Sequence, residues 1–211
     1  MAVRPRREEH KELTRQAVVD TAALRFVAEG FAATTIDEIA RAARVSKGAV
    51  YYHFADKAAL FEAVLRDRLA HLRDVVDRVS ARRRDPWDRL DAALGAYVQV
   101  VAGDAELRSL IAQAPLALGP RRCAEVDEEA GLSVVLEVIG RLQADGRLHR
   151  QGAPMLARVL LAAAREAAIS AARSADPAAA RREASAALTA FTRGLRHTQA
   201  GRTSGRQAGR R

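Results

Sequence analysis

Residues 35–54 read TIDEIARAARVSKGAVYYHF, and they carry the clearest structural signal in the chain. Thr35 followed by Glu38 forms a capping box, which predicts the start of a short helix. Ser46 is a good N-cap for a second helix, and Arg44–Val45 form a short turn between the two. Small or apolar residues stand where two such helices would cross: Ile36, Ile39, Ala40, Ala43, Val45 and Val50. The stretch therefore predicts a helix-turn-helix.

The second of these helices exposes groups suited to the major groove of DNA. Lys47 offers a cation, while Gly48 and Ala49 are small enough for the helix backbone to approach base edges. Two tyrosines and a histidine at the helix end offer polar groups, and Lys57 can pair with a phosphate. Taken singly, the aromatic residues fit a small helical bundle equally well. The DNA-binding interpretation therefore rests on the combined spacing of all the motif residues.

The segment from Thr35 to Lys57 resembles the tetracycline-repressor (TetR) family, and the similarity extends over about residues 11–66. This resemblance implies a homodimer whose recognition helices enter successive major grooves of a near-palindromic DNA operator, and a ligand pocket in the C-terminal domain. Arg44 stands at a turn position where the family often has glycine, which costs about 1 kcal/mol if the backbone is left-handed. The residues that match the family's DNA-facing positions are Thr35, Ser46, Lys47, Gly48, Ala49, Tyr51, Tyr52, His53 and Lys57.

Composition favours an all-α protein. Apolar residues make up 49% of the 211 residues, aromatic residues only 4%, and the abundant alanine, leucine, arginine and glutamate are good helix formers. The formal net charge of +9 suits a nucleic-acid partner. It does not locate the site, because residues 1–80 hold fourteen basic and twelve acidic side chains.

The organisation predicted along the chain has four parts. Residues 1–8 form a flexible basic arm, residues 9–55 a three-helix DNA-binding domain, and residues 56–197 a helical bundle domain for ligand binding and dimerisation. Residues 198–211 form a disordered, arginine-rich tail. A long helix over residues 56–83 connects the two domains, and further helices are expected at 86–102, 105–118, 122–144, 154–174 and 177–196.

Two kinds of site are expected in the C-terminal half, although ordinary core packing explains apolar residues at the same spacing. The candidate dimer-interface residues are Leu156, Val159, Leu160, Ala163, Ala187, Leu188, Phe191 and Leu195. The candidate pocket residues are Trp87, Leu94, Tyr97, Val101, Leu110, Gln113, Leu136, Glu137 and Glu166.

These features bear differently on three possible functions. A homodimeric repressor released by a small-molecule effector fits the motif and the large helical domain. A non-sensing architectural DNA binder fits the arginine-rich tail. An enzyme lacks support, because the five histidines are scattered without metal-ligand spacing or a nucleophile set, and no cofactor is expected. The lone Cys123 and the lack of a membrane span favour the bacterial cytoplasm, with association to the nucleoid when DNA is bound.

Overall fold

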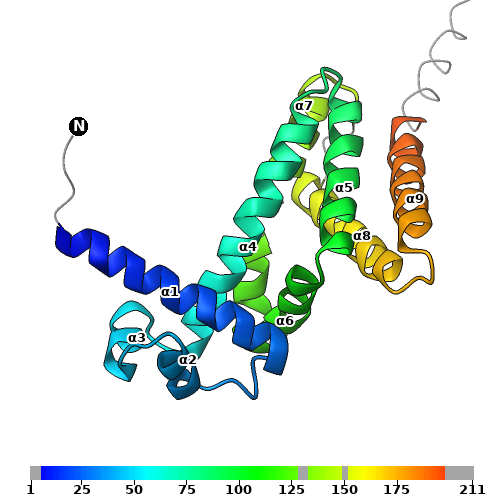
Figure 1. Ribbon diagram of the computed structural model, residues 1–211. Coiled ribbons are helices and arrows are strands. Elements are labelled where there is room, and N and C mark those ends of the chain that lie inside the picture. Colours follow the sequence, from blue (N-terminus) through cyan, green and yellow to red (C-terminus); the bar gives the residue numbers. More distant parts are fainter. Residues whose placement is uncertain (1–5, 128–132, 149–151, 198–211) are drawn as a thin grey trace, which may run out of the picture. The chain divides into compact units, whose positions relative to one another are not determined.

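The computed structural model describes residues 6–127, 133–148 and 152–197. Across these ranges the regular structure is entirely helical, which confirms the predicted all-α class. No helix in them is long and apolar enough to cross a membrane. The helices, labelled in Figure 1, are α1 Arg6–Glu29, α2 Ile36–Ala42, α3 Lys47–His53, α4 Lys57–Ser80, α5 Pro86–Gly103, α6 Ala105–Asp127, α7 Ser133–Ala144, α8 Ala153–Ala172 and α9 Pro177–His197.

The described residues divide into two compact units. The first comprises residues up to Ala70 together with Glu106–Asp127, and the second comprises His71–Ala105 and the residues from Ser133 onward. This division differs from the expected domains of 9–55 and 56–197, because α6 packs with the N-terminal helices and the border falls inside α4. Of the expected basic arm, residues 6–8 already belong to α1. Residues 1–5 and the expected tail lie outside the described part of the chain.

The helix expected over 122–144 lies partly outside the described residues. After the break predicted at Gly119–Pro120, α6 continues to Asp127, and α7 covers Ser133–Ala144. Gly119 has φ 73° and ψ 165°, a conformation outside the helical region that glycine adopts at low cost. Local break signals thus placed the kink correctly.

Three phenylalanines form the centre of the first unit. The ring centroids of Phe26 and Phe61 lie 5.2 Å apart, and the Phe31 ring lies 5.9 Å from Phe26 and 5.4 Å from Phe61. Edge-to-face geometry of this kind stabilises an aromatic cluster beyond simple burial. Phe26 lies near the end of α1 and Phe61 near the start of α4, so the cluster fixes these two helices around α2 and α3. Helices α2 and α3 lie side by side in Figure 1.

Gln113 connects α6 to the turn that follows α1. Its amide nitrogen donates to the Phe26 carbonyl at 3.0 Å, and its amide oxygen accepts from the Phe31 backbone N–H at 2.6 Å. A second link joins α6 to α4, since Arg122 forms an ion pair with Glu62 at 2.6 Å. The Arg122 guanidinium is also the main cause of a lowered pKa at Glu62, against the effect of burial. These contacts explain why α6 belongs to the N-terminal unit.

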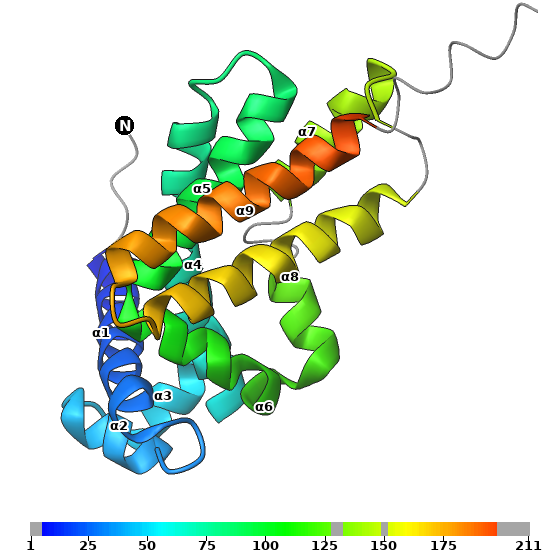
Figure 2. The ribbon, with the colours of Figure 1, turned by 90° about the vertical axis from the view of Figure 1, so that its right-hand side faces the viewer.

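In the second unit, α5 packs against α7, α8 and α9. The inner face of α8 carries mostly alanine, so its backbone approaches α5 closely. Figure 2 shows α8 and α9 side by side, with their chain directions opposed. Asp91 of α5 holds α9 in place, accepting a hydrogen bond from Thr192 and pairing with Arg196 at 2.7 Å.

We expect Gln113→Leu to lower the free energy of unfolding of the N-terminal unit by about 1–3 kcal/mol. The substitution introduces an apolar side chain of similar size and leaves the partly buried Phe31 N–H without its acceptor. Urea unfolding followed by circular dichroism measures the effect. Gln16→Leu is the matched control, because it removes only an exposed hydrogen bond to Asp20 within α1. Equal unfolding midpoints for the two variants would contradict the proposed role of Gln113.

Candidate nucleic-acid interface and ligand cavity

The start of α2 is fixed by the predicted capping box. The Thr35 hydroxyl accepts from the Glu38 backbone N–H at 3.3 Å, and the Thr35 N–H donates to the Glu38 carboxylate at 3.0 Å. The Thr35 hydroxyl also donates to that carboxylate at 2.6 Å. Hydrogen bonds from Thr35 lower the pKa of Glu38, so the box is complete when Glu38 is ionised. Thr35 therefore serves the helix start, and its hydroxyl is already engaged within the protein.

The turn between α2 and α3 depends on a left-handed residue. Arg44 has φ 57°, which confirms that this position takes the backbone conformation glycine favours. The turn is closed by a hydrogen bond from the Val45 N–H to the Ala40 carbonyl at 3.0 Å. Ile39, Ala40 and Val50 are buried at the crossing of the two helices. The steep packing of a helix-turn-helix is therefore present, with strain stored at Arg44.

Helix α3 presents an outer face of polar and small residues. Ser46 caps the helix by accepting from the Ala49 N–H at 3.1 Å, while Val50 is buried beneath it. Tyr51 and Tyr52 are 47% and 69% exposed, respectively, although both are large aromatic residues. The sequence-predicted residues on this solvent-accessible face are Ser46, Lys47, Gly48, Tyr51 and Tyr52, with Ala49 and His53 partly buried at its edges.

Contacts at both ends of α3 hold this face in place. At the first turn, the Lys47 ammonium pairs with Asp37 of α2 at 2.9 Å, and this bond raises the pKa of Lys47. At the last turn, the Lys11 ammonium of α1 lies 4.9 Å from the Tyr52 ring centroid, a cation–π contact. Burial, followed by the charges of Lys11 and Arg15, lowers the pKa of His53, which favours its neutral form. Sequence reasoning missed these roles of Lys11 and Asp37, because both residues lie outside α3.

Gly48 sits on the outer face with nothing crowding it from inside the protein. A Cβ built at Gly48 would meet only the Ser46 hydroxyl oxygen, at 3.8 Å, an ordinary contact. Its φ is not in the left-handed region, so the backbone does not require glycine either. The folded chain thus gives no internal reason for glycine at this position.

Lys57 has a different role from the phosphate contact predicted for it. Its ammonium donates to the carbonyls of Phe31 at 2.7 Å and Thr34 at 2.9 Å, and it lies 3.4 Å from the Ala32 carbonyl. The same ammonium stands 4.4 Å from the Phe31 ring centroid. Because three backbone carbonyls occupy its donors, Lys57 stabilises the turn before α2. The arrangement does not support a phosphate contact by this side chain.

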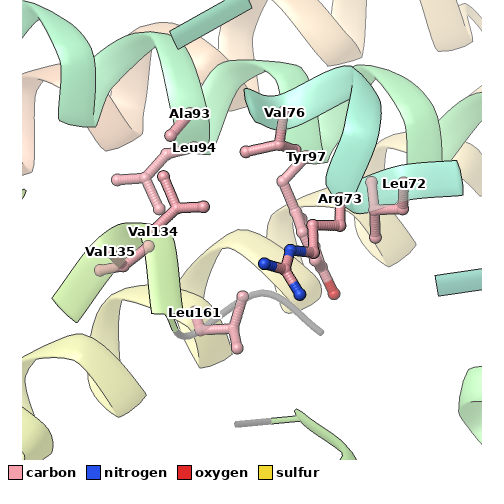
Figure 3. A pocket seen from close by; sticks show the side chains of 9 residues that line it. All are labelled: Leu72, Arg73, Val76, Ala93, Leu94, Tyr97, Val134, Val135 and Leu161. Carbon is pink, nitrogen blue, oxygen red and sulfur yellow. The ribbon is translucent and has the colours of Figure 1, made fainter. Parts of the chain in front are cut away.

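An apolar cavity lies within the second unit, between α4, α5, α7 and α8. Its enclosed volume is about 20 Å³, room for about one water molecule. Figure 3 shows aliphatic side chains around most of it and the Arg73 guanidinium beside the Tyr97 ring. The lining residues are Leu72, Arg73, Val76, Ala93, Leu94, Tyr97, Val134, Val135 and Leu161.

Only Leu94 and Tyr97 of the predicted pocket residues line this cavity. Leu110 and Gln113 belong to the N-terminal unit, and Glu137 is exposed and paired with Arg89. Trp87 and Val101 are buried elsewhere, Leu136 is partly buried and Glu166 is exposed, all away from the cavity lining. Helical spacing identifies which residues face inward, but it does not identify which inward residues border the same space.

Part of the predicted dimer interface is also corrected. Leu160 and Leu188 are buried within their own chain, so they are not available to a second copy. Val159 and Phe191 remain 45% and 49% exposed, as unusual apolar residues on the outer faces of α8 and α9. Of the remaining candidates, Ala187 is exposed, and Leu156, Ala163 and Leu195 are partly buried.

Together, the fold and the site define a helix-turn-helix protein with a separate all-α unit that encloses a small cavity. Within the described ranges, no group of His, Cys, Asp and Glu side chains is arranged to hold a metal ion. A family model for bacterial regulatory proteins of the tetR family matches residues 18–64. A model for the tetracyclin repressor-like C-terminal domain matches residues 87–195. The chain belongs to the tetR family.

Individual relatives agree with this assignment. A probable acrEF/envCD operon repressor of Escherichia coli K12 is 31% identical over 142 residues, which cover 66% of this chain and 61% of that protein. A TetR-family transcriptional regulator from Pectobacterium atrosepticum, known as a crystal structure, is 27% identical with a TM-score of 0.69, covering 92% of this chain and 98% of that one. These relatives are regulators rather than enzymes.

A second similar structure was solved with a ligand. RolR in complex with resorcinol is 18% identical with a TM-score of 0.67, covering 90% of this chain and 96% of that one, a likeness in fold. The chain spans less than two thirds of the length of the curated relatives it matches, 61% in the case of the operon repressor.

We expect Arg44→Gly to raise the free energy of unfolding by up to about 1 kcal/mol, because it removes a side chain from a left-handed backbone. Arg41→Gly is the matched control in the last turn of α2, where helical glycine costs about 1 kcal/mol. Thermal or urea unfolding of both variants checks the pair. A loss of stability at Arg44 equal to that at Arg41 would show that the turn is not strained.

Proposed function

We propose that this chain is a homodimeric, sequence-specific DNA-binding repressor that a small-molecule effector releases from its operator. The outer face of α3 is the observation that supports the proposed DNA binding. It combines a cation at Lys47, open backbone at Gly48 and two exposed tyrosines on a helix fixed at both ends. A rigid helix with small residues at its start can enter the major groove, where polar side chains read base edges.

Dimerisation is proposed through α8 and α9. Val159 and Phe191 expose large apolar surface on these two helices, which burial against a second copy would remove from water. Two helices from each copy would form a four-helix interface. A dimer of this kind presents two α3 helices, so its operator is expected to be double-stranded DNA with two related half-sites.

Effector response is proposed for the second unit. It encloses an apolar cavity with two polar side chains, and RolR, a protein of the same fold, was crystallised with resorcinol. A ligand that binds one conformation of the dimer more tightly than another shifts the population, and DNA affinity follows. The site of action is expected to be the bacterial cytoplasm, with the protein on the nucleoid when bound to DNA.

The second candidate is an architectural DNA binder whose helical unit only dimerises. The small cavity volume of about 20 Å³ favours it, since typical ligand pockets exceed about 300 Å³. The two functions differ in one measurement: release from DNA by a small molecule occurs in the first and not in the second.

Gly48→Ala is expected to weaken binding to operator DNA at least about tenfold without lowering stability. The added methyl group fits the protein itself but stands between α3 and the groove. The DNA is obtained by selecting bound sequences from a random duplex pool, and affinity is measured by gel shift at fixed salt. Gly140→Ala in α7 is the control, because its Cβ also meets open space and it lies outside the α3 face.

Both alanine variants should unfold at or slightly above the wild-type temperature, since alanine is the better helix former. Only the Gly48 variant should lose DNA affinity. Failure of the wild-type chain to enrich any sequence would overturn the proposed function. Equal affinity of the two variants would remove Gly48 from the contact surface.

Phe191→Glu is expected to raise the dimer dissociation constant at least about tenfold, because it puts a charge into an apolar interface. Sedimentation equilibrium over a range of protein concentrations measures this constant. Leu24→Glu is the control, since Leu24 is 65% exposed on α1, which belongs to the other compact unit. A shift caused by Leu24→Glu but not by Phe191→Glu would place the interface elsewhere.

A further inference from the structure

The cavity of the second unit joins an aliphatic interior to a single charged group. Seven of its nine lining residues are leucine, valine or alanine, contributed by α4, α5, α7 and α8. Among these nine, Arg73 is the one charged residue, and Tyr97 is the other polar one. Figure 3 shows the Arg73 side chain extending from α4 alongside the Tyr97 ring, with Leu161 on the opposite side. The lining therefore has a cationic edge and an apolar remainder.

Arg73 is available to an incoming anion. Its side chain is 50% exposed, so the guanidinium stands at the solvent edge of the cavity rather than deep within it. Arg73 forms an ion pair with Asp77, one turn further along α4, at 3.7 Å, and the Asp77 side chain is also solvent-exposed. An exposed pair at that distance contributes little, so a carboxylate in a bidentate hydrogen-bonded arrangement would replace it.

The apolar part of the lining determines what kind of molecular body the anionic group of a ligand can carry. Val76, Leu94 and Val134 offer no hydrogen bond to a polar ligand body, so a sugar or a nucleotide base would lose its water contacts without replacement. A cationic ligand would meet the Arg73 charge. An aliphatic or aryl body loses nothing on leaving water, and each buried methylene is expected to raise affinity roughly fourfold.

We propose that the effector is an amphipathic monocarboxylate, with its carboxylate bound by Arg73 and its apolar body among the aliphatic side chains of α5, α7 and α8. The inference rests on the proposed function, in which a small molecule releases the protein from DNA. The cavity of about 20 Å³ is too small for such a body, so binding must widen the space between these helices. That requirement couples ligand binding to a change in helix packing.

The test compares matched pairs of probes that differ only in the charged group. Hexanoate is compared with 1-hexanol, and benzoate with benzyl alcohol, by isothermal titration calorimetry on the full chain without DNA. Each carboxylate is expected to bind at least about tenfold more tightly than its alcohol. Lengthening from butanoate to octanoate is expected to raise affinity stepwise. Equal affinity of acid and alcohol, or no binding of any carboxylate, would overturn the proposal.

Variants separate Arg73 from general charge effects. Arg73→Gln is expected to lower carboxylate affinity at least about tenfold and to leave alcohol affinity unchanged, while Arg73→Lys retains part of the carboxylate affinity. Arg78→Gln is the matched control on the same helix, because Arg78 is exposed, bonds its own helix at the Asp74 carbonyl and does not line the cavity. Equal carboxylate affinity of Arg73→Gln and wild type would place the anion site elsewhere.

A gel shift with the selected operator distinguishes failure of this inference from failure of the proposed function. Release of DNA by carboxylates in wild type, but not in Arg73→Gln, supports both. Tight carboxylate binding by calorimetry without release of DNA retains the ligand class and overturns the effector-controlled function. Release by the alcohols alone retains effector control and overturns the ligand class.

Discussion

The turn between α1 and α2 is the constraint on which the DNA-facing surface depends. This turn carries backbone groups that neither helix can satisfy, and two distant side chains supply the partners. The Lys57 ammonium donates hydrogen bonds to the carbonyls of Phe31 and Thr34, while the Gln113 amide oxygen accepts one from the Phe31 N–H. Thr34 is itself fully buried, with its hydroxyl donating to the Gly30 carbonyl at 2.8 Å. Because α2 starts directly after this turn, its position, and that of α3 packed on it, follows from these bonds.

A consequence is that α3 belongs to a rigid assembly rather than to a flexible reading element. Its inner side is anchored by Val50, its start by the Lys47–Asp37 pair and its end by Lys11 over the Tyr52 ring. The exposed ion pair is weak by itself, but the buried core does not depend on it. DNA phosphates can therefore compete with Asp37 for Lys47 without loosening the helix. In the proposed function, an effector would then act on the whole unit rather than on the folding of α3.

Local rules predicted the motif well and failed where contacts span the chain. The caps at Thr35 and Ser46 and the left-handed Arg44 follow from neighbours within four residues, and all were visible in the sequence. The role of Gln113 depends on residues more than 80 positions away, and no periodicity encodes that pairing. An amide on a mostly apolar helix fits a pocket wall as well as a bridge to a turn, so the prediction placed Gln113 in the wrong setting. The same reason explains why α6 was assigned to the wrong unit.

Lys57, which supports the turn before α2, and Arg73, which borders the cavity, both lie on the continuous helix α4. These residues are 16 positions apart, about 24 Å along an ideal helix axis. The sequence of α4 shows charged residues recurring among apolar ones, and nothing in that pattern separates a charge that supports a turn from one that borders a cavity. Only the surroundings do so: backbone carbonyls face Lys57, and aliphatic side chains face Arg73.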